Sequence, residues 1–240
     1  MIDAPAELID DLVIANKILF QHKIVDAFGH VSVRHPADPN RYIMSRHLAP
    51  DLVVPEDLVL FDLDSVPQPD IGKRYYSERY IHGEIYKRRP DVHSVVHCHA
   101  SALIQFGVTK TKLLPIYHMS AFLGEGVPVF EIREKAGFTN MLVRTPELGV
   151  ALAEKLAREP MILMRGHGAT MVGASIQESV YRAIYATENA AIELEALRLG
   201  EITFLAPEEA AQYGKYVGEV LHRPWALWKR DALAQERSSG

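Results

Sequence analysis

The chain has little cysteine and no excess of positive charge. Among its 240 residues there is a single cysteine, which excludes an internal disulfide framework. The formal net charge is −5, so nothing favours binding to a nucleic acid or to an anionic membrane surface. No apolar run has the length that a bilayer-spanning helix needs, and no signal peptide is recognisable. These absences favour a cytoplasmic protein that acts on a small molecule.

The chain does have enough apolar residues for a sizeable core. Hydrophobic residues make up 48% of it and charged residues 24%. No linker, repeat or low-complexity segment divides the chain. We therefore predict a single domain over residues 1–240, with a C-terminal helical extension over about 206–240. The tail from Arg230 onward is expected to be frayed.

Helical and strand patterns alternate along the chain. Apolar spacing, capping residues and prolines predict helices over residues 5–20, 77–88, 100–106, 147–158 and 176–199, with a last helix from Pro207. Short apolar or alternating runs predict strands over residues 31–34, 41–44, 58–63, 92–99, 127–130, 161–164 and 170–172. The tight turn at residues 38–40 favours an antiparallel or mixed sheet, so the predicted fold class is α/β with a mixed sheet.

The most informative segment reads Val-Val-His-Cys-His-Ala over residues 95–100. Side chains two apart on a strand leave the same face, so His97 and His99 can hold one metal ion while Cys98 points away. His167, in a glycine-flanked turn, could supply a third ligand. Imidazole nitrogens suit Zn²⁺, Mn²⁺ or Fe²⁺, and three ligands leave a coordination position open for catalysis.

Glu78 lies near the start of the helix that leads into the histidine strand. A carboxyl group there could move a proton as a general acid or base, or could simply interact with the helix dipole. A lone buried histidine is more often a hydrogen-bonded core group than a ligand, but three histidines with a glutamate favour a site. We interpret His82 as a helix side chain and His93 as a surface residue.

Five segments together resemble the class II aldolase/adducin family, in order and spacing, from about residue 5 to 205. They read Gly-His-Val-Ser-Val-Arg at 29–34, Ser-Glu-Arg-Tyr-Ile-His-Gly-Glu-Ile-Tyr at 77–86, Arg-Pro-Asp at 89–91, Val-Val-His-Cys-His-Ala at 95–100 and Arg-Gly-His-Gly at 165–168. The resemblance implies a three-layer α/β/α sandwich around a mostly antiparallel mixed sheet, usually assembled as a homotetramer with active sites at subunit interfaces. It also implies one divalent metal ion per subunit on His97, His99 and His167, with Glu78 as the catalytic acid or base.

The places where the sugar-phosphate aldolases of this family hold phosphate differ here. Their Gly-Asn-x-Ser turn, Thr-Pro-Ser/Thr-Gly-like turn and Ser-Ser pair correspond to residues 29–32, 45–48 and 76–77, which carry bulky or cationic groups. Such groups make a poor phosphate cradle, whereas Arg46 could grip a planar carboxylate with two parallel hydrogen bonds. Arg46 could also be a surface ion-pair partner. The residues expected to contact the substrate are His30, Ser32, Ser45, Arg46, His47 and Ser77.

A second contrast concerns Tyr117 and His118. The aldolases carry a catalytic tyrosine, donated across the subunit interface, near the position of His118, and here the tyrosine comes one residue earlier. The acid at that place could therefore be an imidazole, or both residues could simply pack at a subunit contact. The segments at 45–50, 80–86 and 127–133 look most like the branch that decarboxylates hydroxylated aromatic or pyridine dicarboxylates.

The resemblance therefore favours a metal-dependent lyase that decarboxylates a hydroxylated aromatic or pyridine carboxylate. One alternative is an aldolase that cleaves a hydroxy-carbonyl substrate, such as a sugar or sugar phosphate. Another is a non-catalytic scaffold like the adducin head, against which the retained histidines and Glu78 argue. A non-haem iron oxygenase is a remote further alternative.

Overall fold

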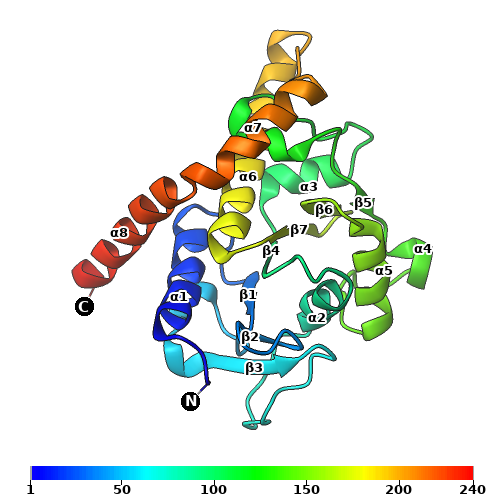
Figure 1. The fold of residues 1–240 in the computed structure, drawn as a ribbon. Coiled ribbons are helices and arrows are strands. Elements are labelled where there is room, and N and C mark those ends of the chain that lie inside the picture. Colours follow the sequence, from blue (N-terminus) through cyan, green and yellow to red (C-terminus); the bar gives the residue numbers. More distant parts are fainter. Residues whose placement is uncertain (1, 240) are drawn as a thin grey trace.

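The computed structural model describes residues 2–239, in which seven strands form one sheet with helices on both of its faces (Figure 1). The strand order is β3-β2-β1-β4-β7-β6-β5, and all neighbours are antiparallel except β5 and β6. The strands are β1 (His30–Arg34), β2 (Arg41–Ser45), β3 (Leu58–Asp62), β4 (Ser94–Cys98), β5 (Val129–Phe130), β6 (Met161–Met164) and β7 (Gly168–Gly173). The predicted mixed, mostly antiparallel sheet is confirmed.

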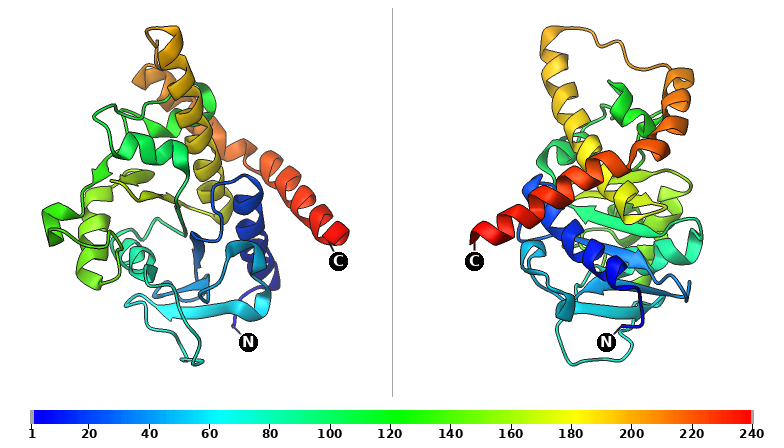
Figure 2. Two further views of the ribbon diagram at one scale, coloured as in Figure 1. Left: turned by 180° about the vertical axis from the view of Figure 1, so that it is seen from behind. Right: turned by 60° about the vertical axis from the view of Figure 1, so that its left-hand side comes forward.

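The helices make two outer layers. One face of the sheet carries α1 (Ala6–Gln21), α3 (Ser101–Gly107) and α6 (Ile176–Leu199), and the other carries α2 (Arg79–Arg88) and α5 (Pro146–Leu156), as Figure 2 also shows. A short helix, α4 (Arg133–Ala136), packs on α5. The three-layer α/β/α fold class is therefore confirmed.

Strand β4 contributes side chains to the cores on both faces of the sheet. Val96 and Cys98 belong to the core beneath α1 and α6, whereas Val95 belongs to the core beneath α2 and α5. Successive strand side chains point to opposite faces, so His97 faces α2. Cys98 is fully buried on the opposite face, and burial raises the pKa of its thiol to about 11, which makes it an inert core thiol.

Several boundaries differ from the sequence-based ones. The helix predicted from residue 77 begins at Arg79, so that Glu78 is its N-cap residue. The strand predicted to run to His99 ends at Cys98, which places His99 just beyond the sheet. The structure adds the 3₁₀ helices η1 (Pro50–Leu52), η2 (Pro55–Asp57) and η3 (His118–Leu123), which lack the apolar periodicity of longer elements.

The C-terminal part forms α7 (Pro207–Val220) and α8 (His222–Ser239). The tail from Arg230 is expected to be frayed, but it is helical up to Ser239, so that expectation is wrong for these residues. Gly240 lies outside the described residues. Helix α8 packs on α1, where Trp228 is buried against the His22 ring and Lys229 Nζ lies 2.5 Å from Asp11 Oδ1. These contacts stabilise α8 against the rest of the chain. None of the described helices has the length and apolar character needed to cross a bilayer.

Candidate metal centre

Strand pairing brings the histidines together on the α2 face of the sheet. His30 pairs with His97 across β1 and β4, and His97 pairs with Thr170 across β4 and β7. The turn between β6 and β7 then places His167 beside the end of β4. A Cβ atom at Gly168 would collide with the Cys98 carbonyl oxygen, so this close approach requires glycine.

Three imidazole nitrogens converge on one point. His99 Nε2 lies 3.1 Å from His97 Nε2 and 3.1 Å from His167 Nε2. Nitrogen ligands at the usual Zn–N distance in a tetrahedral site are ~3.4 Å apart. These three atoms and a Glu78 carboxylate oxygen all lie within 4.8 Å of one another. The donor set and its spacing therefore fit a single divalent cation.

The Nδ1 atoms of His97 and His167 are hydrogen-bonded in a way that leaves Nε2 of each ring free to bind a metal. His167 Nδ1 lies 2.9 Å from the Met141 carbonyl oxygen, which can only accept, so the ring donates from Nδ1. His97 Nδ1 lies 3.2 Å from Thr170 Oγ1, and that hydroxyl donates onward to Met164 Sδ. Partners of this kind orient metal-binding histidines.

Glu78 directs its carboxylate at the same point. Its Oε1 accepts a hydrogen bond of 2.8 Å from the Val143 amide, while its Oε2 lies 3.4 Å from His167 Nε2 and 3.8 Å from His97 Nε2. One oxygen is thus held by the backbone and the other faces the imidazoles. This geometry suits a fourth ligand or a group that carries a proton to a bound molecule.

The protonation preferences of the imidazoles agree with this arrangement. Burial and then the neighbouring imidazoles lower the pKa of His97 and of His99, which keeps both rings neutral. Burial also acts to lower the pKa of His167, but the hydrogen bond and charge of Glu78 outweigh it and raise that pKa. His97 and His99 are thus neutral nitrogen donors, and a bound cation would take the place of the proton that Glu78 favours on His167.

Of the residues expected to contact substrate, three belong to β1 and β2. His30 stands next to the cluster, its ring centroid 5.1 Å from that of His97. Ser32 is fully buried, and its hydroxyl is hydrogen-bonded to His82 and Tyr86 rather than open to a ligand. Ser45 is also buried, with Oγ 3.4 Å from the Tyr76 hydroxyl.

The remaining three lie on loops. Arg46 Nε forms an ion pair of 2.6 Å with Asp57, and its side chain is 35% exposed. His47 and Ser77 are exposed. The rings of His47 and His30 both contact Tyr76, with centroids 5.5 and 4.6 Å away. Tyr76 therefore links this loop to the histidine cluster.

Tyr117 and His118 lie elsewhere in the chain. The Tyr117 hydroxyl donates to Glu188 on α6 over 3.2 Å, and the His118 ring packs edge-on against Tyr213 on α7, with centroids 4.8 Å apart. Within residues 2–239, no interaction joins either side chain to the four-residue cluster. The structure of one chain thus does not bring them to the candidate metal centre.

The sequence interpretation missed the part that His82 plays in the core. Rather than an ordinary helix side chain, His82 is fully buried, with Nε2 2.7 Å from His30 Nδ1 and Nδ1 2.6 Å from Ser32 Oγ. His82 and Tyr86 are four residues apart on α2, so they share one helix face. This spacing of two polar side chains on one helix face is the sequence feature that could have indicated a buried polar pair.

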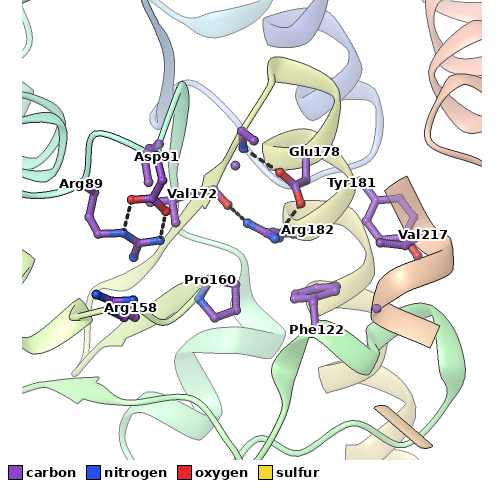
Figure 3. A pocket seen from close by; sticks show the side chains of 14 residues that line it. Arg89, Asp91, Phe122, Arg158, Pro160, Val172, Glu178, Tyr181, Arg182 and Val217 are labelled. Carbon is purple, nitrogen blue, oxygen red and sulfur yellow. Dashed lines mark hydrogen bonds and ion pairs between the residues drawn. The ribbon is translucent and has the colours of Figure 1, made fainter. Parts of the chain in front are cut away.

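A cavity of about 470 Å³ lies at the end of β4 and β7 that is opposite to the histidines. Figure 3 shows the side chains that line it. Arginines line it, but two of them are already paired. Arg89 Nη2 lies 2.7 Å from Asp91, and Arg182 Nη2 lies 2.7 Å from Glu178. The charges of these two arginines are therefore already balanced by carboxylates.

Comparison with known proteins agrees with the geometry. The chain is 39% identical to decarboxylase tropJ of Talaromyces stipitatus, over 89% of this chain and 90% of that protein. It is 27% identical to 3,4-dihydroxyphthalate decarboxylase of Rhodococcus jostii, over 72% of each. L-fuculose 1-phosphate aldolase from Glaciozyma antarctica shares the fold, with a TM-score of 0.80 and 21% identity over 97% of this chain and 91% of that one.

The family resemblance seen in the sequence is therefore confirmed. Residues 10–194 match the family model described as the class II aldolase and adducin N-terminal domain, which covers more than half of the chain. Enzymes named decarboxylases are among its relatives. The chain belongs to the class II aldolase and adducin N-terminal domain family.

Proposed function

We propose that this protein is a metal-dependent carbon–carbon lyase that decarboxylates a hydroxylated aromatic or pyridine carboxylate. The observation that carries the proposal is the convergence of His97, His99 and His167 Nε2 with the Glu78 carboxylate. Two relatives, both named decarboxylases, support the choice of reaction.

His97, His99 and His167 would hold one divalent ion per subunit. Zn²⁺ and Mn²⁺ are the leading candidates and Fe²⁺ is a third, because all three accept imidazole nitrogen. When bound, the ion supplies a Lewis acid for the ring hydroxyl oxygen next to the departing carboxylate. Three protein ligands would leave one coordination position open.

Glu78 is the residue placed to move the proton. Its Oε2 faces the imidazoles while the Val143 amide fixes its Oε1. We assign Glu78 the delivery of a proton to the ring carbon that bears the carboxylate. The bond from that carbon to the carboxylate then breaks, CO₂ leaves, and the bonding pair returns to the ring and restores its aromaticity.

The substrate carboxylates require cationic or hydrogen-bonding partners. Arg46 is held through Nε by Asp57, and neither of its terminal nitrogens bonds to a described residue. A guanidinium fixed in this way can bind a carboxylate through two parallel hydrogen bonds. We propose that Arg46, with His30 and His47, grips the substrate, and that Ser45 and Ser77 complete this side of the site.

We further propose a homotetramer whose sites lie at subunit interfaces. Within one chain, Tyr117 and His118 contact α6 and α7 rather than the cluster. Their expected role as an acid therefore requires that they reach the site of a neighbouring subunit. The exposed His118 ring is compatible with such a contact.

Aldol cleavage is the second candidate, because the fold is shared with L-fuculose 1-phosphate aldolase. Retro-aldol cleavage and decarboxylation both leave an electron pair that a substrate oxygen can accept, and a divalent ion held by the three histidines would supply the Lewis acid for either reaction. The residues at the phosphate-cradle positions argue against a sugar phosphate, since Arg46, His47 and His30 are large. A scaffold without metal chemistry has no observation in its favour.

The experiment is a substrate panel. The metal-loaded protein is incubated with hydroxylated phthalates, hydroxypyridine dicarboxylates and sugar phosphates, while CO₂, aldehyde and O₂ are monitored. We expect CO₂ from an aromatic or pyridine substrate without aldehyde and without O₂ consumption. Aldehyde without CO₂ would favour the aldolase, O₂ consumption an oxygenase, and no turnover together with no bound metal the scaffold.

A further inference from the structure

Four buried polar side chains form a continuous hydrogen-bonded chain behind the candidate metal centre. His30 Nδ1 lies 2.7 Å from His82 Nε2, His82 Nδ1 lies 2.6 Å from Ser32 Oγ, and Ser32 Oγ lies 2.7 Å from the Tyr86 hydroxyl. Their exposed fractions are between 0% and 4%. Burying this many polar groups is costly unless each is satisfied, so the order of donors and acceptors matters.

The end of the chain at Tyr86 sets that order. The Tyr86 hydroxyl is buried, so its proton needs an acceptor within the protein. The phenol proton then has Ser32 Oγ as its acceptor, the only side-chain oxygen or nitrogen bonded to that hydroxyl among residues 2–239. A phenol is also a better donor than acceptor.

The proton positions follow one after another from Tyr86. Ser32 Oγ accepts from Tyr86 and donates its own proton to His82 Nδ1. His82 is fully buried, and burial lowers its pKa to about 3, so the ring is neutral with one proton. That proton must be on Nε2, from which it is donated to His30 Nδ1. The proton of a neutral His30 ring is therefore on Nε2.

His30 presents that nitrogen beside the candidate metal centre. Its ring packs against those of His97 and Tyr76, and His82 already occupies its Nδ1. Its Nε2 makes no hydrogen bond to any residue in the described part of the chain. A molecule bound beside His97 would therefore meet a fixed N–H donor.

We propose that His82, Ser32 and Tyr86 are positioning residues that hold His30 with its proton on Nε2, where it donates a hydrogen bond to a carboxylate oxygen of the substrate. The proposal rests on the proposed function for the identity of the ligand. It also revises the role expected for Ser32, whose hydroxyl is used within this chain and does not touch substrate. A neutral donor suits a buried site, because no second buried charge is introduced.

The direct test is the tautomer of His30 in the wild-type protein, read by nuclear magnetic resonance of ¹⁵N-labelled histidine in the Zn²⁺-loaded form. His30→Gln assigns the His30 signals by their disappearance. We expect a protonated Nε2 and an unprotonated Nδ1 on His30, with a through-hydrogen-bond coupling from His30 Nδ1 to His82 Nε2. A proton on His30 Nδ1, or no such coupling, would overturn the proposal.

A second measurement separates positioning from mere packing. His82→Leu removes the donor to His30 and keeps an apolar side chain of similar size in the core. We expect kcat/KM on a decarboxylated substrate to fall about tenfold or more, because a His30 ring that is no longer held loses its hydrogen bond to the charged carboxylate. His93→Leu, at the exposed residue just before the strand that carries His97, is the matched control and should retain wild-type activity.

The two proposals fail in different ways. A His82→Leu protein that folds, binds metal and keeps kcat/KM within twofold of wild type would contradict the positioning role. If His82→Leu does not fold, the wild-type spectrum alone decides. A wild-type protein that shows the expected tautomer but releases no CO₂ from any panel substrate would contradict the proposed function and leave the hydrogen-bonded chain intact.

Discussion

His99 and His167 lie with their Nε2 atoms 3.1 Å apart although 68 residues separate them in the sequence. The β4–β7 pairing and the glycine after His167 produce this approach, since the Gly168 backbone touches the Cys98 carbonyl. The candidate metal centre therefore depends on the backbone as much as on its ligands.

Replacing Gly168 with alanine tests that dependence. The added methyl group would overlap the Cys98 carbonyl oxygen, and backbone cannot yield as a flexible side chain does. We expect the free energy of unfolding to fall by about 2 kcal/mol or more, with loss of metal affinity. Gly214→Ala is the control, because a Cβ there meets nothing within 4 Å. Equal denaturation midpoints for the two variants would contradict this account.

Glu78→Gln tests proton transfer separately from metal binding. Glutamine is the same size and can still accept the hydrogen bond from Val143, but it cannot carry the proton. We expect kcat to fall by about 10²–10⁴, the usual contribution of general acid–base catalysis, while the bound metal is retained. Steady-state kinetics together with metal analysis measure both. Activity within a factor of two of wild type would remove Glu78 from the mechanism.

The pH dependence of stability has a specific source in Glu193. Burial raises the pKa of this carboxyl group to about 7, although hydrogen bonds from Leu114 and Asn189 act in the opposite direction. The folded state therefore holds a proton that the unfolded state has released above its ordinary pKa of about 4.5, so stability falls as the pH rises from about 4.5 to about 7.

Glu193→Gln should remove this contribution. We expect the difference in unfolding free energy between the variant and wild type to shift in favour of the variant between pH 5 and pH 8, by on the order of 1–3 kcal/mol. Chemical denaturation at several pH values measures it. A difference that does not change with pH would show that Glu193 has an ordinary pKa in the folded protein.

The proposed interface role of Tyr117 and His118 can be tested by mixing subunits. His118→Gln and Glu78→Gln proteins, each of low activity alone, are dissociated together and reassembled. If His118 serves the site of a neighbour, mixed oligomers contain some sites with both intact residues, and measurable activity returns. Activity that stays at the sum of the two separate proteins would indicate that His118 takes no part across the interface.

The sequence was sufficient for the elements with strong periodicity and for the histidine pair. Helix α6 begins at Ile176, directly after its N-cap residue Ser175, whose side chain accepts a hydrogen bond from the Glu178 amide. It ends before Gly200, as the capping pattern predicts. Features of this kind depend on residues that are close together in the sequence, so the sequence alone predicts them. The joining of His167 to His97 was inferred from residue types and the family resemblance, because no local pattern encodes a pairing between distant strands.

The parts that could not be predicted depend on tertiary packing. His99 was expected on the strand with His97, but it lies beyond the strand end and reaches the same point by a different backbone path. Ser32 was expected to contact substrate, yet α2 packs over it and engages its hydroxyl. The ion pair between Arg46 and Asp57 likewise depends on how two loops meet.

Metal stoichiometry with reconstitution of activity tests the central claim most directly. Wild type, His99→Ala and the exposed control His93→Ala are stripped with a chelator, reloaded with Zn²⁺ or Mn²⁺, and assayed for bound metal and CO₂ release. The account predicts about one ion per chain and restored activity for wild type and His93→Ala, and neither for a folded His99→Ala protein. Full CO₂ release by the stripped wild type, or unchanged metal binding by His99→Ala, would contradict it.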